Sequence, residues 1–325
     1  MKYKNLAWLT VGLALCVIVL GAFVRLSDAG LGCPDWPGCY GHLAWPDEHH
    51  EIAAANEAFP ERAAEPHKAW KEMVHRYLAG TLGLLVLALF VWAFKQRHKQ
   101  SYALPLVLCF VILFQAALGM WTVTLKLHPG IVMSHLLGGM LMLSLLTWLA
   151  CSRTESITPY RYAGHVKQSM IIFALILLVV QIALGGWTSA NYAALACQGF
   201  PACNGELMPA MNFKEGFDLF KGYGPNYEFG VLDGPARVAI QMMHRMGFVV
   251  VTLYFAWLIF KLTRNRELMP LGVSLAILLF VQILLGIMNV TMALPLPIAT
   301  MHNGVAALLL MTTVILLYKT RGSTS

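Results

Sequence analysis

The chain reads VLGAFVRLSDAGLGCPDWPGCYG at residues 19–41 and ALGGWTSANYAALACQGFPACNG at residues 183–205. In both stretches an apolar segment runs into a loop with two cysteines separated by five residues. Three further pairs of segments follow in the same order: MVHRYLAG (73–80) with MMHRMGFV (242–249), QAALG (115–119) with QILLG (282–286), and SHLLGGMLML (134–143) with MHNGVAALLL (301–310). A repeat that keeps four landmarks in order indicates a duplicated structural unit.

The composition excludes a water-soluble protein. Of the 325 residues, 58% are apolar and 12% are charged, and the mean hydropathy is +0.64. Soluble globular domains are roughly 45–50% apolar and about 25% charged, and disorder does not fit a chain with 11% aromatic residues. The net charge of +7 does not point to nucleic acid, because the basic residues are dispersed in short loops. We therefore expect a polytopic helical membrane protein.

Eight apolar runs are long enough to cross a bilayer, which takes about 20 residues of helix. They lie at 6–24, 74–94, 102–124, 131–151, 168–188, 238–260, 270–293 and 298–318. Four runs fall in each repeat, and an even number gives both repeats the same orientation, related by an axis along the membrane normal. We therefore expect an all-α polytopic membrane protein with eight transmembrane helices in two tandem four-helix bundles, formed by residues 1–160 and 161–325.

The distribution of basic residues predicts the orientation, because Lys and Arg accumulate in cytoplasmic loops. One side of the membrane receives 13 basic and 2 acidic residues, and the other side receives 10 basic and 14 acidic residues. Both termini are therefore expected in the cytoplasm, and segments 25–73 and 189–237 on the extracytoplasmic side of a bacterial inner membrane. Residues 1–24 have the charge pattern of a signal peptide, but their repetition in the second half argues against cleavage.

Four of the 11 histidines are placed within the first turns of predicted spans. His75 and His135 belong to the second and fourth spans of the first repeat, and His244 and His302 to the same spans of the second. A histidine inside a membrane is costly without a partner, so it is a candidate for function. A hydrogen bond between helices could explain one such residue, but not readily four at equivalent positions.

Each half thus offers two imidazoles at similar depth that can face each other across a bundle. Zinc prefers four close ligands, whereas haem needs two axial ligands and fits between helices. We therefore predict one haem in each half. An arginine follows the first histidine of each pair, and Arg76 and Arg245 are candidates for contacts with haem propionates. The alternative is that these arginines only reach toward the membrane surface.

The halves differ at the position three residues before the first histidine. The first half has Glu72 before His75, and the second has Gln241 before His244. Residues three apart share a helix face, so Glu72 is expected at the edge of whatever His75 binds. A carboxylate can accept a proton and an amide cannot, which predicts chemistry in the first site and a held cofactor or an electron relay in the second. The alternative is a solvated Glu72 at the start of its span.

Four cysteines lie in the two extracytoplasmic segments, where disulfides persist. We predict the pairs Cys33–Cys39 and Cys197–Cys203, because the intervening PDWPG and QGFPA are rich in turn-forming residues. Metal binding is the alternative, although no third or fourth ligand stands nearby in the sequence.

Taken together, these features resemble the haem A synthase family. The resemblance rests on the tandem four-helix halves, the loop GLGCPDWPGCYG at 30–41, the E-x-x-H-R at 72–76, the H-R at 244–245, and His135 and His302. It covers almost the whole chain. The two cysteine pairs place the chain in a disulfide-bearing bacterial branch of that family.

The resemblance implies an oxidoreductase that converts the C8 methyl of haem O to the formyl group of haem A, by successive hydroxylations, for the assembly of terminal oxidases. It implies that His75 and His135 receive the substrate haem, that His244 and His302 hold haem b, and that Glu72 is the essential carboxylate. It also implies membrane lipid as the surroundings, and haem O synthase, a protohaem farnesyltransferase, and an electron acceptor as partners. A homo-oligomer is compatible with the sequence.

Two other functions use similar features. A di-haem b electron-transfer cytochrome would use the same four histidines, but it gives no reason for a carboxylate in one half only. A proton-coupled transporter would also combine parallel repeats with buried ionisable groups. Such a transporter would bind no haem, and the predicted spans lack the midplane breaks of transporter folds.

Overall fold

The computed structural model describes residues 2–154, 166–219, 224 and 226–321, and this part of the chain is helical, without a β-strand. Eight of its helices are long and apolar enough to span a membrane, which confirms the predicted all-α polytopic class. They are α1 (Tyr3–Leu26), α3 (Pro66–Lys95), α4 (Ala103–Thr124), α5 (Pro129–Ser152), α6 (Gln168–Ala190), α8 (Gly234–Thr263), α9 (Met269–Thr291) and α10 (Leu296–Thr320). Two short helices, α2 (His49–Ala58) and α7 (Phe213–Gly216), lie in the long connecting segments.

Two of the long helices begin four or more residues earlier than the apolar runs predict. Helix α3 starts at Pro66 and α8 at Gly234, each with a proline in its first turn, where the missing N–H costs nothing. The polar residues that open these helices lower the local hydropathy but do not interrupt helical hydrogen bonding. The expectation that His75 and His244 lie in first turns was therefore wrong, because both lie in the third turn. His135 and His302 lie in the second turns of α5 and α10.

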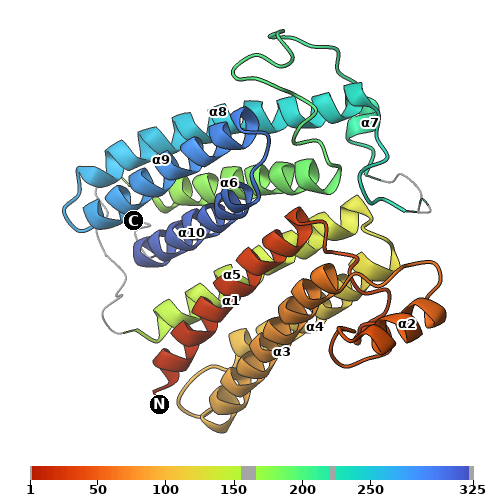
Figure 1. The fold of residues 1–325 in the computed structure, drawn as a ribbon. Coiled ribbons are helices and arrows are strands. Elements are labelled where there is room, and N and C mark those ends of the chain that lie inside the picture. Colours follow the sequence, from red (N-terminus) through yellow and green to blue (C-terminus); the bar gives the residue numbers. More distant parts are fainter. Residues whose placement is uncertain (1, 155–165, 220–223, 225, 322–325) are drawn as a thin grey trace.

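The long helices of each half pack against one another in the same pattern (Figure 1). In the first half, α1 and α4 each contact both α3 and α5. In the second half, α6 and α9 each contact both α8 and α10. This is the contact pattern of a four-helix bundle. The expected boundary between the halves, at residues 160 and 161, falls within 155–165 and lies outside the described residues.

The two halves are joined along their length and at one end. Helix α10 packs against α1 and α5, and α5 also packs against α6, around a shared apolar core. Beyond the core, Arg25 at the end of α1 donates to the Tyr192 hydroxyl at 2.8 Å and to the Ser189 carbonyl at 2.7 Å. An ion pair of 3.3 Å joins Arg62 to Glu228 across the long segments of the two halves. The halves therefore meet through polar contacts at the end that carries the long segments, called the loop end below.

The repeat extends to the backbone conformation of the loops. Four pairs of equivalent non-glycine residues have a positive φ, which residues other than glycine rarely adopt. The pairs are Asp28 (49°) with Tyr192 (52°), Tyr40 (53°) with Asn204 (54°), Lys126 (47°) with Ala293 (56°), and Leu127 (62°) with Leu294 (61°). Since the side chains differ in three of the four pairs, the shared conformation reflects the common loop geometry rather than residue preference.

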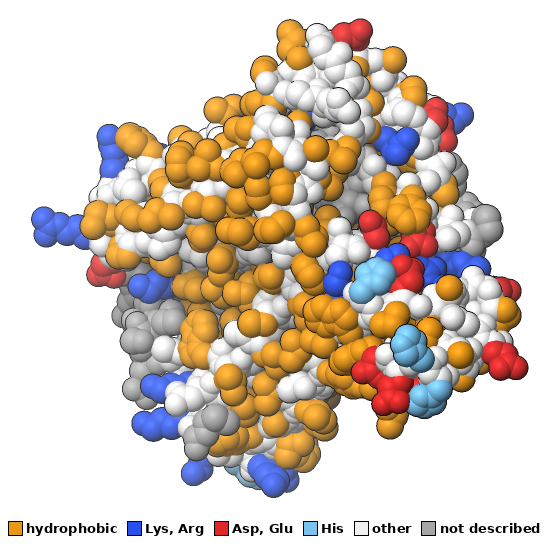
Figure 2. All heavy atoms as spheres, in the orientation of Figure 1, with side chains coloured by type: hydrophobic (Ala, Val, Ile, Leu, Met, Phe, Trp, Pro, Cys, Tyr) orange, Lys and Arg blue, Asp and Glu red, His pale blue; other side chains and the backbone are white. Residues whose placement is uncertain are grey.

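The surface separates into an apolar belt and two charged ends. Large apolar side chains on the spans are exposed, such as Leu84 at 68%, Phe110 at 65% and Leu253 at 67%, as expected for contact with lipid. In Figure 2 the left side, where both termini lie in Figure 1, carries mainly basic side chains, whereas acidic side chains and histidines gather on the right at the loop end together with further basic side chains. The two ends of the molecule thus differ in charge as the sequence predicts.

Candidate functional site

Each of the four predicted histidines lies against a glycine of a neighbouring helix. The Cε1 edge of the imidazole faces the glycine, and a Cβ added there would be closer to the ring than an ordinary carbon contact of about 3.5–4.0 Å. The distances from such a Cβ to Cε1 are 2.9 Å for Gly21 and His75, 3.4 Å for Gly119 and His135, 3.1 Å for Gly185 and His244, and 3.2 Å for Gly286 and His302. The missing side chains therefore provide the room that the four rings occupy.

The histidines come together in two pairs, one in each half. His135 is within electrostatic range of His75, and His302 is within electrostatic range of His244. The Nδ1 atoms of His75, His135 and His302 are buried and have no hydrogen-bond partner in the described part of the chain. Since buried polar atoms in proteins are nearly always paired, these nitrogens indicate a site for a ligand.

The donor set fits a haem better than a bare metal ion. Among the described residues, no group of three or more His, Cys, Asp or Glu side chains could hold a metal ion. A zinc ion would need more protein ligands than a pair of imidazoles supplies. A porphyrin brings four equatorial nitrogens to its iron and asks the protein only for axial ligands. Two imidazoles in each half are sufficient for that.

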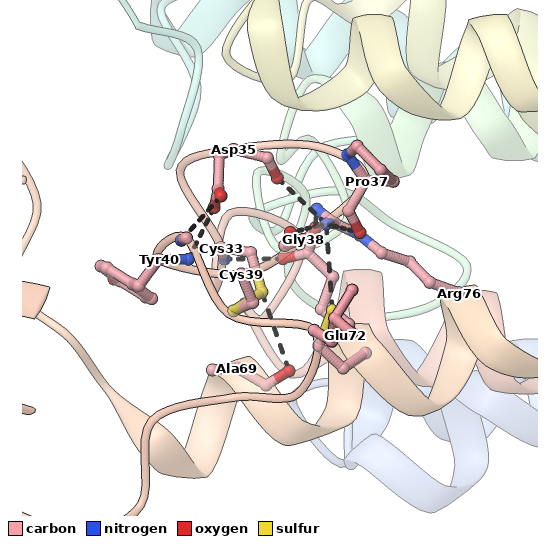
Figure 3. The surroundings of a disulfide bond; sticks show 12 residues. Cys33, Asp35, Pro37, Gly38, Cys39, Tyr40, Ala69, Glu72 and Arg76 are labelled. Carbon is pink, nitrogen blue, oxygen red and sulfur yellow. Dashed lines mark hydrogen bonds and ion pairs between the residues drawn. A yellow bond between two sulfur atoms is a disulfide. The ribbon is translucent and has the colours of Figure 1, made fainter. Parts of the chain in front are cut away.

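Glu72 is bound to the loop between α1 and α3 (Figure 3). Its side chain is 5% exposed, so it is not the solvated residue of the alternative interpretation. Oε2 accepts from the Cys33 N–H at 3.0 Å, and Oε1 accepts from Arg76 Nη2 at 2.5 Å. The loop packs directly on α3 at Gly32, where a Cβ would lie 2.8 Å from the backbone of Lys68. The loop between α1 and α3 and the Arg76 side chain thus orient the Glu72 carboxylate, which lies one helical turn before His75.

The two arginines of the H-R motifs hold the loops. Arg76 Nη1 donates to the carbonyls of Asp35 at 3.0 Å, Pro37 at 3.2 Å and Gly38 at 2.5 Å. In the second half, Arg245 donates to the carbonyls of Cys197, Gly199, Pro201 and Ala202 at 2.8 to 3.4 Å. Neither guanidinium is simply extended to the surface, and contacts with haem propionates stay a prediction.

Both predicted disulfides are present in these loops. Cys33 is bonded to Cys39 and Cys197 to Cys203, each with a Cα–Cα distance of 4.8 Å. Gln241 takes the place of Glu72 in the second half and is also 5% exposed, but its Oε1 has no partner among the described residues. The halves therefore share the disulfide, the arginine and the histidine pair, and they differ in the carboxylate.

A family model described as cytochrome oxidase assembly protein, COX15-CtaA, matches residues 4–314. The chain belongs to the COX15-CtaA family. Among its curated relatives is the haem A synthase of Shewanella oneidensis, 48% identical over 318 residues that cover 97% of this chain and 96% of the relative. The haem A synthase of Paracoccus denitrificans is 30% identical and covers 93% of this chain and 84% of the relative. The expected family is thus confirmed.

The structure of this COX15-CtaA protein adds residues that the sequence did not single out. The four glycines lie in segments already aligned by the repeat, such as the end of QAALG at 115–119 and of QILLG at 282–286. They went unnoticed because glycine is common in membrane helices, where it also serves ordinary helix packing. The recurrence of these glycines at equivalent positions of both halves is the sequence feature that could have indicated their role beside the histidines.

We predict that Gly21→Ala and Gly185→Ala each weaken haem binding in their own half. The added methyl would displace His75 or His244, and overpacking of this kind costs about 1–3 kcal/mol. Haem affinity should therefore fall roughly 10- to 100-fold, measured by haem titration of the purified protein. Gly12→Ala on α1, where a Cβ meets nothing within 4 Å, is the matched control. Equal haem affinities for Gly21→Ala and Gly12→Ala would contradict the prediction.

Proposed function

We propose that this chain is a haem A synthase, which oxidises the C8 methyl group of haem O to the formyl group of haem A for the assembly of terminal oxidases. The observation that carries the proposal is the 48% identity to a haem A synthase over nearly the full length of both chains. Two successive hydroxylations of the methyl give a geminal diol, which loses water to leave the formyl group. A second haem, held in the other half by His244 and His302, would supply one-electron transfer.

The two histidine pairs receive different haems in this proposal. His75 and His135 position the substrate haem O, and His244 and His302 hold haem b. The assignment is supported by the carboxylate, because Glu72 lies one turn from His75 and the second half has Gln241 at that place. The apolar belt around the spans lets a farnesylated substrate enter from the lipid between helices of the first half.

Glu72 accepts protons released as the methyl group is oxidised. Its two oxygens are held by Arg76 and by the Cys33 N–H, so the carboxylate keeps one orientation beside the substrate site. Arg76 is in turn fixed by three loop carbonyls. The disulfide loop, the arginine and the carboxylate thus act as one unit that positions the base.

The first test is the chemical identity of the bound porphyrins. We expect purified protein supplied with haem O to yield haem A, identified by mass spectrometry of the extracted porphyrins. His75→Ala should abolish the product and keep protohaem bound, whereas His244→Ala should lose protohaem. If only protohaem is recovered from every preparation, the chain is a di-haem b cytochrome and the proposal fails. A preparation without haem absorption would exclude both.

The second test separates the base from a merely structural carboxylate. Glu72→Gln keeps an acceptor for the Cys33 N–H and cannot take a proton, so haem A formation should fall by about 100-fold or more with haem content unchanged. The exchange in the other half, Gln241→Glu, is the matched control and should change the rate much less. Substantial haem A formation by Glu72→Gln would remove Glu72 from the mechanism.

The orientation in the membrane is part of the proposal. We place both termini on the cytoplasmic side of a bacterial inner membrane, because basic residues outnumber acidic ones at that end of the molecule, with 13 against 2. Alkaline phosphatase, which is active only outside the cytoplasm, should be inactive when fused after Arg321 and active when fused after Ala58 in α2. The opposite result would invert the orientation.

Two partners follow from the reaction. Haem O has to come from the enzyme that makes it, a protohaem farnesyltransferase, and the electrons removed from the methyl group have to pass to an acceptor. Co-purification of this chain with the farnesyltransferase from membranes tests the first of these partners. Absence of the pair under conditions that preserve other membrane complexes would count against it.

A further inference from the structure

Three of the four glycines that face a histidine are preceded by a glutamine four residues earlier. These are Gln115 before Gly119 on α4, Gln181 before Gly185 on α6, and Gln282 before Gly286 on α9. Residues four apart share one face of a helix. The fourth glycine, Gly21 on α1, is preceded by Val17 instead. The helix surface that faces His75 therefore carries an apolar side chain where the other three carry an amide.

In the second half, glutamine side chains contact both histidines. Gln181 Nε2 lies 3.1 Å from His244 Nδ1 and donates to the His244 backbone carbonyl at 3.0 Å. Gln282 Nε2 lies 3.3 Å from His302 Nε2. The Gln181 amide needs the space left by Gly247, where a Cβ would lie 2.2 Å from Gln181 Oε1. Each imidazole of this half thus has a glutamine amide from an adjacent helix beside it, at Nδ1 in His244 and at Nε2 in His302.

The first half has no such contact at His75. Its Nδ1 is buried without a hydrogen-bond partner within the described residues. Leu78 stands where the second half has Gly247, so the amide and the room for it are both missing beside His75. At His135 the glutamine is present, but the Gln115 amide packs on Gly138, and His135 Nδ1 has no hydrogen-bond partner among the described residues.

A second contact on the imidazole matters for a metal ligand. When one ring nitrogen binds a metal, the other carries the proton of the neutral ring and needs an acceptor. In the structure Gln181 Nε2 faces His244 Nδ1 and the His244 carbonyl, and Gln181 Oε1 is buried and unpaired. Rotation of the amide, which gives up the bond to that carbonyl, would bring Oε1 to the Nδ1 proton. Such contacts fix the ring and strengthen its bond, and their loss typically weakens metal binding about 10- to 100-fold.

We propose that Gln181 is a positioning residue that makes the second-half haem a retained cofactor, whereas Val17 leaves His75 free to release the haem of the first half. The proposal rests on the proposed function and gives its two haem sites a physical difference in residence time. A substrate has to leave after the reaction, and a cofactor has to stay. An amide beside the axial histidine, together with the space for it, then determines which of the two a site holds.

The experiment uses the full-length protein in detergent, loaded with protohaem as the probe for both sites. Excess apomyoglobin captures haem as it leaves, and we expect a fast and a slow phase. His75→Ala should remove the fast phase and His244→Ala the slow one. Gln181→Met removes the amide with little change in side-chain volume, and it should speed the slow phase about 10- to 100-fold.

A second readout follows the axial bond itself. Carbon monoxide binds ferrous haem only where an axial ligand has left, so Gln181→Met should raise the rate of carbon monoxide binding at the slow site. Gln168→Met, the same exchange near the start of α6, is the matched control and should leave both phases unchanged. Loss of helicity in Gln181→Met but not in Gln168→Met would make Gln181 structural and overturn the proposal.

The reciprocal change should convert the first site. Val17→Gln combined with Leu78→Gly supplies the amide and the space for it, and it should slow the fast phase about tenfold or more. Unchanged release from the second site in Gln181→Met would overturn the proposal while leaving the proposed function intact. Failure of the unsubstituted protein to bind protohaem would instead overturn the proposed function.

Discussion

Four imidazoles packed against glycines determine the architecture of this protein. A histidine is expensive among apolar helices, and the chain arranges its helices to accept four of them, three with a buried Nδ1 that has no partner in the described part of the chain. The glycines on α1, α4, α6 and α9 let each ring lie close to the neighbouring backbone. The duplication places one histidine pair in each half. In each half the disulfide loop binds the arginine that follows the first histidine, Arg76 or Arg245.

The loop with the disulfide is connected to the chemistry through a short series of contacts. Arg76 binds the carbonyls of the loop on one side and Glu72 on the other, and Cys33 contributes its N–H to the same carboxylate. In the second half Arg245 binds four carbonyls and, among the described residues, no carboxylate. The same loop therefore supports a charged residue in one half and only the helix end in the other.

Much of the fold was predictable because the bilayer imposes a simple length and hydropathy requirement. The eight spans and the two disulfides follow from apolar runs and from cysteines separated by a turn. The start of α3 was not predictable from hydropathy, because its polar first turns lie beyond the apolar run yet remain helical. Helices α2 and α7 were missed for a similar reason, since short polar helices in loops carry no span signal.

The site was predictable in its residue types but not in its contacts. His75 and Glu72 stand out by their position and by the difference between the halves. The partners of Arg76 depend on how the loop folds back over α3, and no local sequence pattern predicts that loop conformation. Gln181 was hidden because QIALG at 181–185 looks like any other membrane segment until the ring of His244 is seen beside it.

The helix contacts between the two halves are related by an approximate twofold symmetry. Helix α5 meets its own equivalent, α10, and the contact of α1 with α10 is the counterpart of the contact of α6 with α5. Surfaces that pair in this reciprocal manner are those of a symmetric homodimer. The arrangement is that of two self-associating four-helix units joined in one polypeptide, in which each unit is free to differ from the other. Arg25, whose counterpart is Ser189, is an asymmetry that no homodimer could have had.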